Sequence, residues 1–215
     1  MTAERLRVLV AAPDPTVLAG CYDGVSARLV EQAGFHAAHM SGFAVAGSLL
    51  GRPDVGLLTM TEMADAASRI ARVLSIPLLA DADTGYGNAL NVVRTVEAYI
   101  AGGVAGMHLE DQQMPKRCGH LSGKTIVPAD EMAGKLRAAI DTRDAVGIDI
   151  VIVARTDARA DEGLDAALER ARRYRDAGAD LLFVEALQSP AEVEAVAETF
   201  HDIPLVFNAS EARPP

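Results

Sequence analysis

The chain has 215 residues, of which 50% are hydrophobic and 23% are charged, a composition typical of a globular domain with a substantial core. Disordered, collagen-like and disulfide-rich classes are thereby excluded. The chain carries 30 acidic and 20 basic side chains, a formal net charge of -10, so a nucleic acid backbone would be repelled and nucleic acid is not an expected partner.

The cysteines and apolar stretches indicate where the protein resides. Cys21 and Cys118 lie far apart and in no metal-type or disulfide-type spacing, as expected in a reducing compartment. The first ten residues contain Glu4, Arg5 and Arg7 and no apolar core of signal-peptide length. The longest uncharged stretch, residues 35–51, is too short and too polar to span a bilayer. We therefore expect a soluble cytoplasmic protein with no membrane partner.

Short apolar runs alternate along the chain with segments whose apolar residues recur at helical spacing. Seven runs are predicted to be strands: residues 17–21, 37–40, 77–80, 107–109, 150–154, 181–184 and 205–207. Helical faces are predicted within residues 63–74, 92–100, 132–140, 164–171 and 193–200, the last opened by Ser189 and Pro190 as cap and first position. The strands lack alternation and are separated by helices, which favours parallel strands buried on both faces.

This order of elements allows an open doubly wound sheet or a (β/α) barrel, and seven strands in 215 residues favour the barrel. No linker divides the chain, so residues 1–215 are interpreted as one domain. At roughly 25–30 residues per strand–helix unit, a (β/α)8 TIM-type barrel would be truncated after the seventh strand, with at least one C-terminal unit missing. An open edge must be covered, so either another subunit closes it or the chain is a fragment or a degenerate copy.

Every predicted strand is followed by polar residues: Tyr22 and Asp23, Ser41 and Gly42, Asp81 and Asp83, Glu110 and Asp111, Arg155, Glu185, and Asn208. In a barrel these positions converge on the C-terminal mouth, where such enzymes keep their chemistry. The alternative is that strands simply end where polar loops begin. Charges of both signs at these positions favour a site.

Two carboxylates, Asp81 and Asp83, open the segment Asp-Ala-Asp-Thr-Gly-Tyr-Gly-Asn at residues 81–88. Oxygen ligands of this kind, with waters completing an octahedron, suit Mg²⁺ or Mn²⁺ and not zinc. The alternative is a helix-capping aspartate followed by a turn. Neither a dinucleotide fingerprint nor a Walker pattern is present, so the sequence does not favour a nucleotide.

The thiol of Cys118 has the cationic neighbours Lys116 and Arg117, together with His120, in the segment Pro-Lys-Arg-Cys-Gly-His. Positive charge stabilises the thiolate and makes proton transfer feasible, although a buried cysteine in an ordinary basic loop remains the alternative. Cys21 lies in an apolar run and is interpreted as inert core.

Arg155 ends the fifth predicted strand in the segment Ala-Arg-Thr-Asp-Ala. A guanidinium is the usual clamp for a carboxylate, but a structural ion pair with Asp157 is equally compatible with this spacing. His108, inside a strand, and His36 and His39 are interpreted as hydrogen-bonded structural residues and not as ligands.

Together these segments resemble the isocitrate lyase / phosphoenolpyruvate mutase superfamily. The resemblance runs from about Leu18 to Asn208 and includes Ser-Gly-Phe at 41–43, Gly-Arg-Pro-Asp-Val-Gly at 51–56 and Glu-Asp-Gln at 110–112, besides the three segments above. The Lys-Arg-Cys-Gly-His run is highly specific. The sequence is most similar to short-chain members of the methylisocitrate lyase and alkylmalate lyase type.

The resemblance implies a (β/α)8 barrel that binds Mg²⁺ and cleaves a carbon–carbon bond of a 2-hydroxy di- or tricarboxylate. The products would be pyruvate or glyoxylate and a saturated carboxylate. Asp83, Asp81 and Asp54 would hold the metal directly or through water, and Glu110 would support its shell. Ser41, Gly42 and Arg155 would hold the carboxylate of the 2-oxoacid half, and Cys118 would be the proton donor or base. The remaining candidates are Lys116, Arg117, Gly119 and His120 around the thiol, and Tyr22, Glu185 and Asn208 at the mouth.

Other readings of the same site remain open at this point. The resemblance also covers phosphonomutases and oxaloacetate hydrolases or decarboxylases, and a non-catalytic truncated barrel is a third possibility. The expected partners are a small-molecule carboxylate and further copies of the chain in a dimer or tetramer. The sequence does not identify the substrate's side chain.

Overall fold

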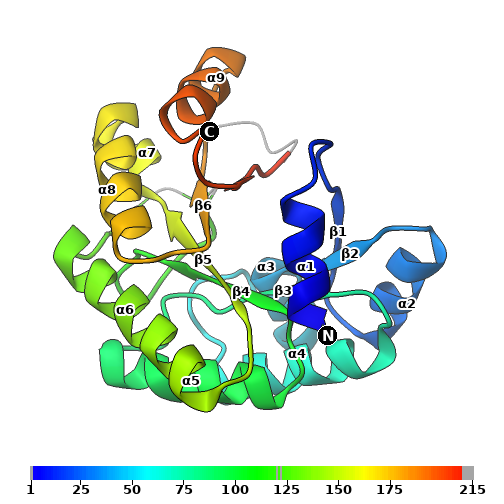
Figure 1. Cartoon of the computed structure of the whole chain (residues 1–215). Coiled ribbons are helices and arrows are strands. Elements are labelled where there is room, and N and C mark those ends of the chain that lie inside the picture. The colour runs from blue at the N-terminus through cyan, green and yellow to red at the C-terminus, as the bar shows by residue number, and fades with distance from the viewer. Residues whose placement is uncertain (1, 120, 122, 210–215) are drawn as a thin grey trace.

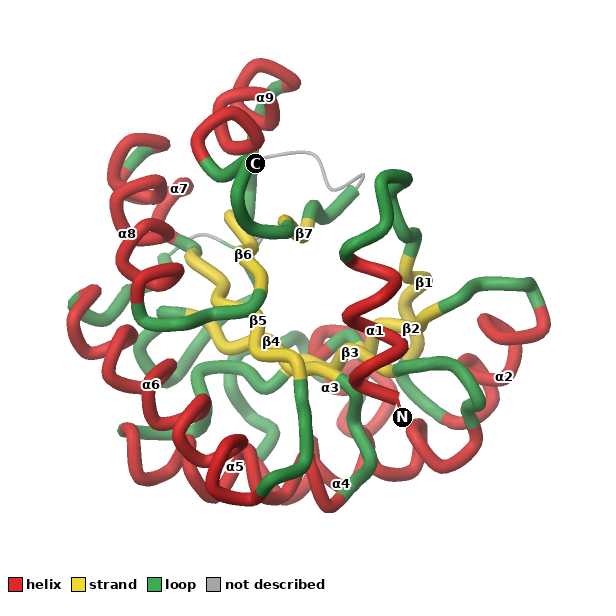
Figure 2. Tube along the Cα trace, in the orientation of Figure 1, coloured by secondary structure: helices red, strands yellow, loops and turns green. Residues whose placement is uncertain are grey.

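Seven parallel strands form one curled sheet in the computed structural model, which describes residues 2–119, 121 and 123–209. The strands pair in chain order: β1 (Leu18–Cys21), β2 (Ala37–Met40), β3 (Leu78–Asp81), β4 (Gly106–Glu110), β5 (Val151–Thr156), β6 (Leu181–Val184) and β7 (Leu205–Val206). Strands β7 and β1 are not neighbours in this order, and Figure 2 shows the sheet open between them. The expected incomplete (β/α) barrel is confirmed.

Helices connect the strands and cover the outer side of the curved sheet (Figure 1). They are α2 (Gly24–Gln32), α3 (Gly42–Leu50), α4 (Met60–Val73), α5 (Ala89–Ala101), α6 (Ala129–Val146), α7 (Ala158–Glu162), α8 (Leu164–Asp176) and α9 (Pro190–Thr199). The five predicted helical faces fall on α4, α5, α6, α8 and α9. The sequence interpretation missed α2, α3 and α7. Helix α7 has only five residues, and the uncharged stretch that holds α3 has no polar face from which a helical period could be recognised.

An additional helix, α1 (Thr2–Val10), covers the N-terminal ends of the strands. Its Leu6 is 1% exposed and packs with residues of the inner sheet face, including Leu79 and Val151. Arg7 forms ion pairs with Asp149, two residues before β5, and with Asp180, directly before β6. The sequence reading assigned no element here, because the partners of Arg7 lie more than 140 positions away.

The inner face of the sheet is apolar toward the N-terminal ends of the strands and polar toward their C-terminal ends. Ala37, Leu79, Val151, Val153 and Leu181 pack with Leu6 in one apolar cluster. Because side chains alternate along a strand, residues two and four positions further along point to the same side. These positions hold the polar series His39 and Ser41, Asp81 and Asp83, Arg155 and Asp157, and Glu185. The candidate residues at the strand ends therefore share one direction, into the barrel mouth.

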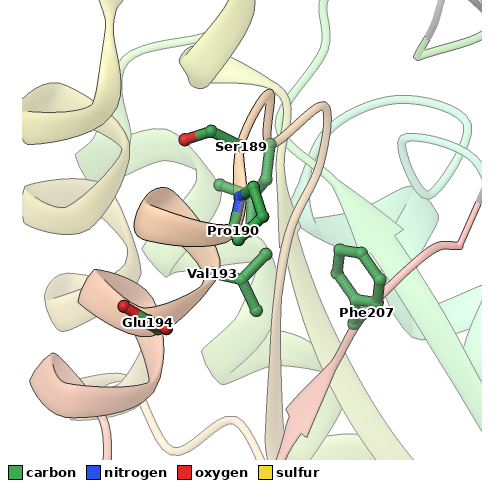
Figure 3. A pocket seen from close by; sticks show the side chains of 6 residues that line it. Ser189, Pro190, Val193, Glu194 and Phe207 are labelled. Atoms are coloured by element: carbon green, nitrogen blue, oxygen red, sulfur yellow. The ribbon is translucent and has the colours of Figure 1, made fainter.

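Two further features concern the outer surface. None of the helices in the described part of the chain is long and apolar enough to cross a membrane. An open groove of about 460 Å³ lies beside α9 and is lined by Leu187, Ser189, Pro190, Val193, Glu194 and Phe207 (Figure 3). None of these residues is among the predicted site residues.

Candidate active site

The three predicted metal ligands lie in one buried cluster at the end of β3. Asp81 accepts hydrogen bonds from the backbone N–H of Asp83 at 2.9 Å and of Gly42 at 3.1 Å. The ammonium of Lys116 lies 2.7 Å from Asp54 Oδ2 and 2.5 Å from Asp83 Oδ1. The sequence predicted that Lys116 would act on the Cys118 thiol. In the structure its ammonium instead pairs with the carboxylates of Asp54 and Asp83.

Two of the three aspartates of this cluster, Asp81 and Asp83, have pKa values shifted in opposite directions. Burial and the neighbouring charge of Asp81 raise the pKa of Asp83 to about 6. Burial alone would raise the pKa of Asp81 too, but His108, Lys116 and Arg155 outweigh it and hold that pKa below its usual range. Asp81 is therefore ionised at neutral pH, and Asp83 takes up a proton only as the pH falls through about 6, a proton that a bound cation would displace.

The donor set fits a hard divalent cation that keeps several waters. Within the described ranges, no three His, Cys, Asp or Glu side chains converge into a complete metal-binding group. Mg²⁺ is usually held by one or two carboxylates with water, so Asp81 and Asp83 suffice. Glu110 Oε1 is buried without a hydrogen-bond partner, and burial raises the pKa of Glu110 well above its ordinary value. The surplus of buried carboxylates over cations favours a positively charged occupant.

Arg155 lies at the centre of a second group, of acidic side chains. Its guanidinium donates to both oxygens of Asp157 at 3.0 Å, and it lies 3.5 Å from Glu110 Oε2 and 3.3 Å from Glu185 Oε2. The amide of Asn208 is 3.5 Å from both oxygens of Glu185. The ion pair with Asp157, left open as an alternative, is thus present, and a substrate carboxylate would share this guanidinium with Asp157.

The sequence interpretation gave no role to Asp111, which holds the Asp157 segment in place. Its carboxylate accepts from the Asp157 backbone N–H at 2.9 Å, from the Thr156 hydroxyl at 2.7 Å and from the Tyr174 hydroxyl at 2.8 Å. Asp111 is 0% exposed. The sequence did offer a signal for Asp111. It directly follows Glu110, and because side chains alternate along a strand, its carboxylate is expected on the opposite face, away from the mouth.

The Cys118 loop is tied to both groups. The Cys118 backbone N–H donates to the Asp54 carbonyl at 3.0 Å, and Cys118 itself is partly exposed. Gly119 packs so closely on Arg155 and Glu185 that a Cβ there would overlap both. Glycine at this position therefore lets the thiol loop approach the guanidinium. His120 lies outside the described residues, so its predicted role stays a prediction.

Ser41, Gly42 and Tyr22 lie at the ends of the first two strands. Ser41 caps α3, and its hydroxyl accepts from the Ala44 backbone N–H at 3.3 Å. Gly42 therefore stands at a helix N-terminus, where backbone N–H groups favour an anion. Tyr22 is 42% exposed, and a role for it in substrate binding is still a prediction.

Gly42 provides a test of the contact between α3 and the carboxylates. A Cβ at Gly42 would lie 2.5 Å from Asp81 Oδ2, whereas a Cβ at Gly47 on the same helix would meet nothing within 4 Å. We expect Gly42→Ala to displace Asp81 and to weaken Mg²⁺ binding in calorimetry by about tenfold. Gly47→Ala should leave binding unchanged and stabilise the helix by about 0.5–1 kcal/mol in thermal unfolding. Equal Mg²⁺ affinity in both variants would contradict the contact.

The two thiols should differ in their reactivity. Burial raises the pKa of Cys21 to about 12, so at pH 8 almost none of it is thiolate, and it is 0% exposed. Native protein treated with iodoacetamide at pH 8 should therefore be alkylated at Cys118 and not at Cys21, as measured by peptide mass spectrometry. Denatured protein, in which the Cys21 pKa returns to its ordinary value, should react at both. Native labelling of Cys21 would contradict the buried assignment.

The sequence was next compared with known proteins. The profile of the family described as phosphoenolpyruvate phosphomutase matches residues 6–215. The chain is 46% identical over 214 residues to 2,3-dimethylmalate lyase of Eubacterium barkeri, covering 100% of this chain and 73% of the relative. It is 45% identical over 209 residues to 2-methylisocitrate lyase of Bacillus subtilis, covering 97% of this chain and 67% of the relative.

Solved structures give the same result. The crystal structure of a 2,3-dimethylmalate lyase matches with a TM-score of 0.96 at 41% identity, covering 100% of this chain and 72% of that one. A phosphonopyruvate hydrolase complex with oxalate and Mg²⁺ matches with a TM-score of 0.84 at 32% identity, covering 95% and 71%. The chain thus spans about two thirds to three quarters of the length of these proteins. The relatives named lyases agree with the predicted enzyme class.

Proposed function

The chain belongs to the phosphoenolpyruvate phosphomutase family, and on that basis we propose that it is a Mg²⁺-dependent carbon–carbon lyase acting on a 2-hydroxy dicarboxylate or tricarboxylate. The observation that carries the proposal is that one barrel mouth holds a buried carboxylate cluster, the Arg155 guanidinium and the Cys118 loop. Similarity to lyases at 45–46% identity supports the same reaction class.

Binding of the substrate follows from the two charged groups. Asp81 and Asp83, with Asp54 through water, would hold Mg²⁺, which when bound supplies Lewis-acid stabilisation of the substrate's hydroxyl and carboxylate oxygens. The positive end of the α3 dipole, beside Ser41 and Gly42, would favour the negative charge of the same carboxylate, and Arg155 offers a planar guanidinium.

The residues of the site also account for the proton transfers. Cleavage removes the proton of the 2-hydroxyl, breaks the adjacent carbon–carbon bond and leaves its electron pair on the carbon next to the second carboxylate. Glu110, whose Oε1 has no hydrogen-bond partner, is the proposed acceptor of the hydroxyl proton. A cation bound beside it would offset the burial that raises its pKa and so favour the carboxylate that can accept. Cys118 is the proposed donor of a proton to the carbanion. A 2-oxoacid and a saturated carboxylate leave, and the thiolate and the Glu110 carboxyl return to their starting states by proton exchange with solvent.

A substrate panel separates this reaction from others of the family. The chain would be incubated with 2,3-dimethylmalate, 2-methylisocitrate, phosphonopyruvate and oxaloacetate, and the products scored as pyruvate, phosphate ester and oxalate. The lyase proposal predicts release of pyruvate from one of the first two compounds. Formation of a phosphate ester from phosphonopyruvate, or of oxalate from oxaloacetate, in place of lyase turnover would instead assign the mutase or the hydrolase reaction.

A further inference from the structure

Two histidines meet inside the barrel, directly below the carboxylate cluster. His39 lies on β2 and His108 on β4, and their Nε2 atoms are 3.1 Å apart. The ring planes differ by 14°, and the ring centroids are 5.3 Å apart. That separation exceeds a face-to-face stack, and the facing nitrogens are close, so the rings meet edge to edge and nearly in one plane. This is the geometry of a nitrogen-to-nitrogen hydrogen bond.

The pair occupies a defined layer of the barrel interior. His39, His108 and Phe183 come from the alternate strands β2, β4 and β6, as layers do in such barrels, and the Phe183 ring packs against His108 with its edge at 6.0 Å between centroids. Above the pair, Asp81 is the register neighbour of His108 on β3. The second ring nitrogen of His108, Nδ1, lies 3.6 Å from Asp81 Oδ1 and has no hydrogen-bond partner.

The two Nε2 atoms are 3.1 Å apart, so one proton lies between them, and the burial of His108, which is 1% exposed, favours a neutral ring. A neutral imidazole carries one N–H and one lone pair, so only one of the two facing Nε2 atoms holds a proton. A lone pair on His108 Nδ1 would face the carboxylate of Asp81 and be repelled by it. The proton of His108 therefore belongs on Nδ1, and the proton between the rings belongs on His39 Nε2.

We propose that His39 is a positioning residue: it donates its Nε2–H to His108 and so fixes His108 in the Nδ1–H form that orients the Asp81 carboxylate. His39 itself makes no contact with substrate in this proposal. His39 acts on Asp81 indirectly: its hydrogen bond fixes the tautomer of His108, and His108 orients the Asp81 carboxylate. Residues that hydrogen-bond to metal ligands commonly affect metal affinity in this way. The proposal rests on the proposed function only in treating Asp81 as a metal ligand.

The first test is independent of metal and activity. Long-range ¹⁵N–¹H correlation spectra of the metal-free protein distinguish protonated from unprotonated ring nitrogens. His108 should show a protonated Nδ1 and His39 a protonated Nε2. A His108 protonated at Nε2 in the unaltered protein would overturn the proposal.

Two variants of His39 provide a matched comparison. His39→Gln keeps an N–H donor near the same place, whereas His39→Leu removes it and keeps the neutral charge. In His39→Leu the His108 signals should shift toward the Nε2–H form and Mg²⁺ affinity in calorimetry should fall about tenfold, whereas His39→Gln should retain both. A role in packing alone would lower the melting temperature of the variants without moving the His108 tautomer, and that result would overturn the proposal. An unaltered protein that binds no Mg²⁺ would instead contradict the proposed function and leave the tautomer result standing.

Discussion

A Cys118→Ser variant is expected to lose about 10²–10⁴-fold in kcat, the range that a positioned proton donor typically contributes. A hydroxyl is a far weaker acid than a thiol, so the substitution removes the proton donor while changing little of the shape of the loop. The backbone hydrogen bond from the Cys118 N–H to the Asp54 carbonyl, which helps to hold the loop, is kept in the variant. Steady-state kinetics with the substrate identified by the panel would measure the loss.

Two controls make the Cys118 result specific. Cys21→Ala alters the other thiol, which is buried in the core away from the site, and should keep nearly full activity. Mg²⁺ affinity of Cys118→Ser should equal that of the unaltered protein, because the thiol is not a proposed ligand. If kcat for Cys118→Ser stays within a few-fold of the parent, another group donates the proton.

Asp83→Asn should abolish most of the metal-dependent activity. Changes to outer partners of metal ligands already cost about 10–100-fold in affinity, so loss of a ligating carboxylate is expected to exceed about 100-fold. Asp83 has a φ of 46°, in the left-handed region, and asparagine tolerates that conformation well, so the backbone need not move. A Mg²⁺ titration of the reaction rate, together with calorimetry, measures the effect.

The matched control for Asp83→Asn is Asp65→Asn. Asp65 pairs with Arg69 on the exposed side of α4, with 57% of its side chain accessible, so the substitution removes the same charge away from the site. It should leave Mg²⁺ affinity and activity unchanged. An Asp83→Asn protein with the parent's Mg²⁺ dependence would remove Asp83 from the metal site.

The strand order and the polar mouth could be predicted from the sequence because both depend on local patterns. Each apolar run was long enough to indicate a buried strand. Each run was followed by a polar residue whose side chain points into the barrel. Asp81, Glu110, Arg155 and Glu185 could therefore be placed at one end of the barrel before their contacts were known. The order of the segments, and above all the run around Cys118, then restricted the chemistry.

The pairing of side chains across the barrel could not be predicted in the same way. Lys116 was assigned to the thiol from its position in the sequence, but the fold brings its ammonium to Asp54, 62 positions away. His39 and His108, interpreted as ordinary interior residues, meet across 69 positions. Such contacts join residues far apart in the chain, and the residues next to each partner in the sequence do not indicate which distant side chain it will meet.

The central claim, metal-dependent cleavage in this mouth, is tested most directly by proton NMR of the 215-residue chain with 2,3-dimethylmalate in D₂O, with Mg²⁺ and with a chelator. The account predicts equimolar pyruvate and propionate, with one deuterium beside the propionate carboxylate, only when Mg²⁺ is present. Turnover that is equally fast with the chelator would contradict the proposed role of the cluster. A folded, Mg²⁺-binding chain that cleaves neither this compound nor 2-methylisocitrate would contradict the lyase assignment.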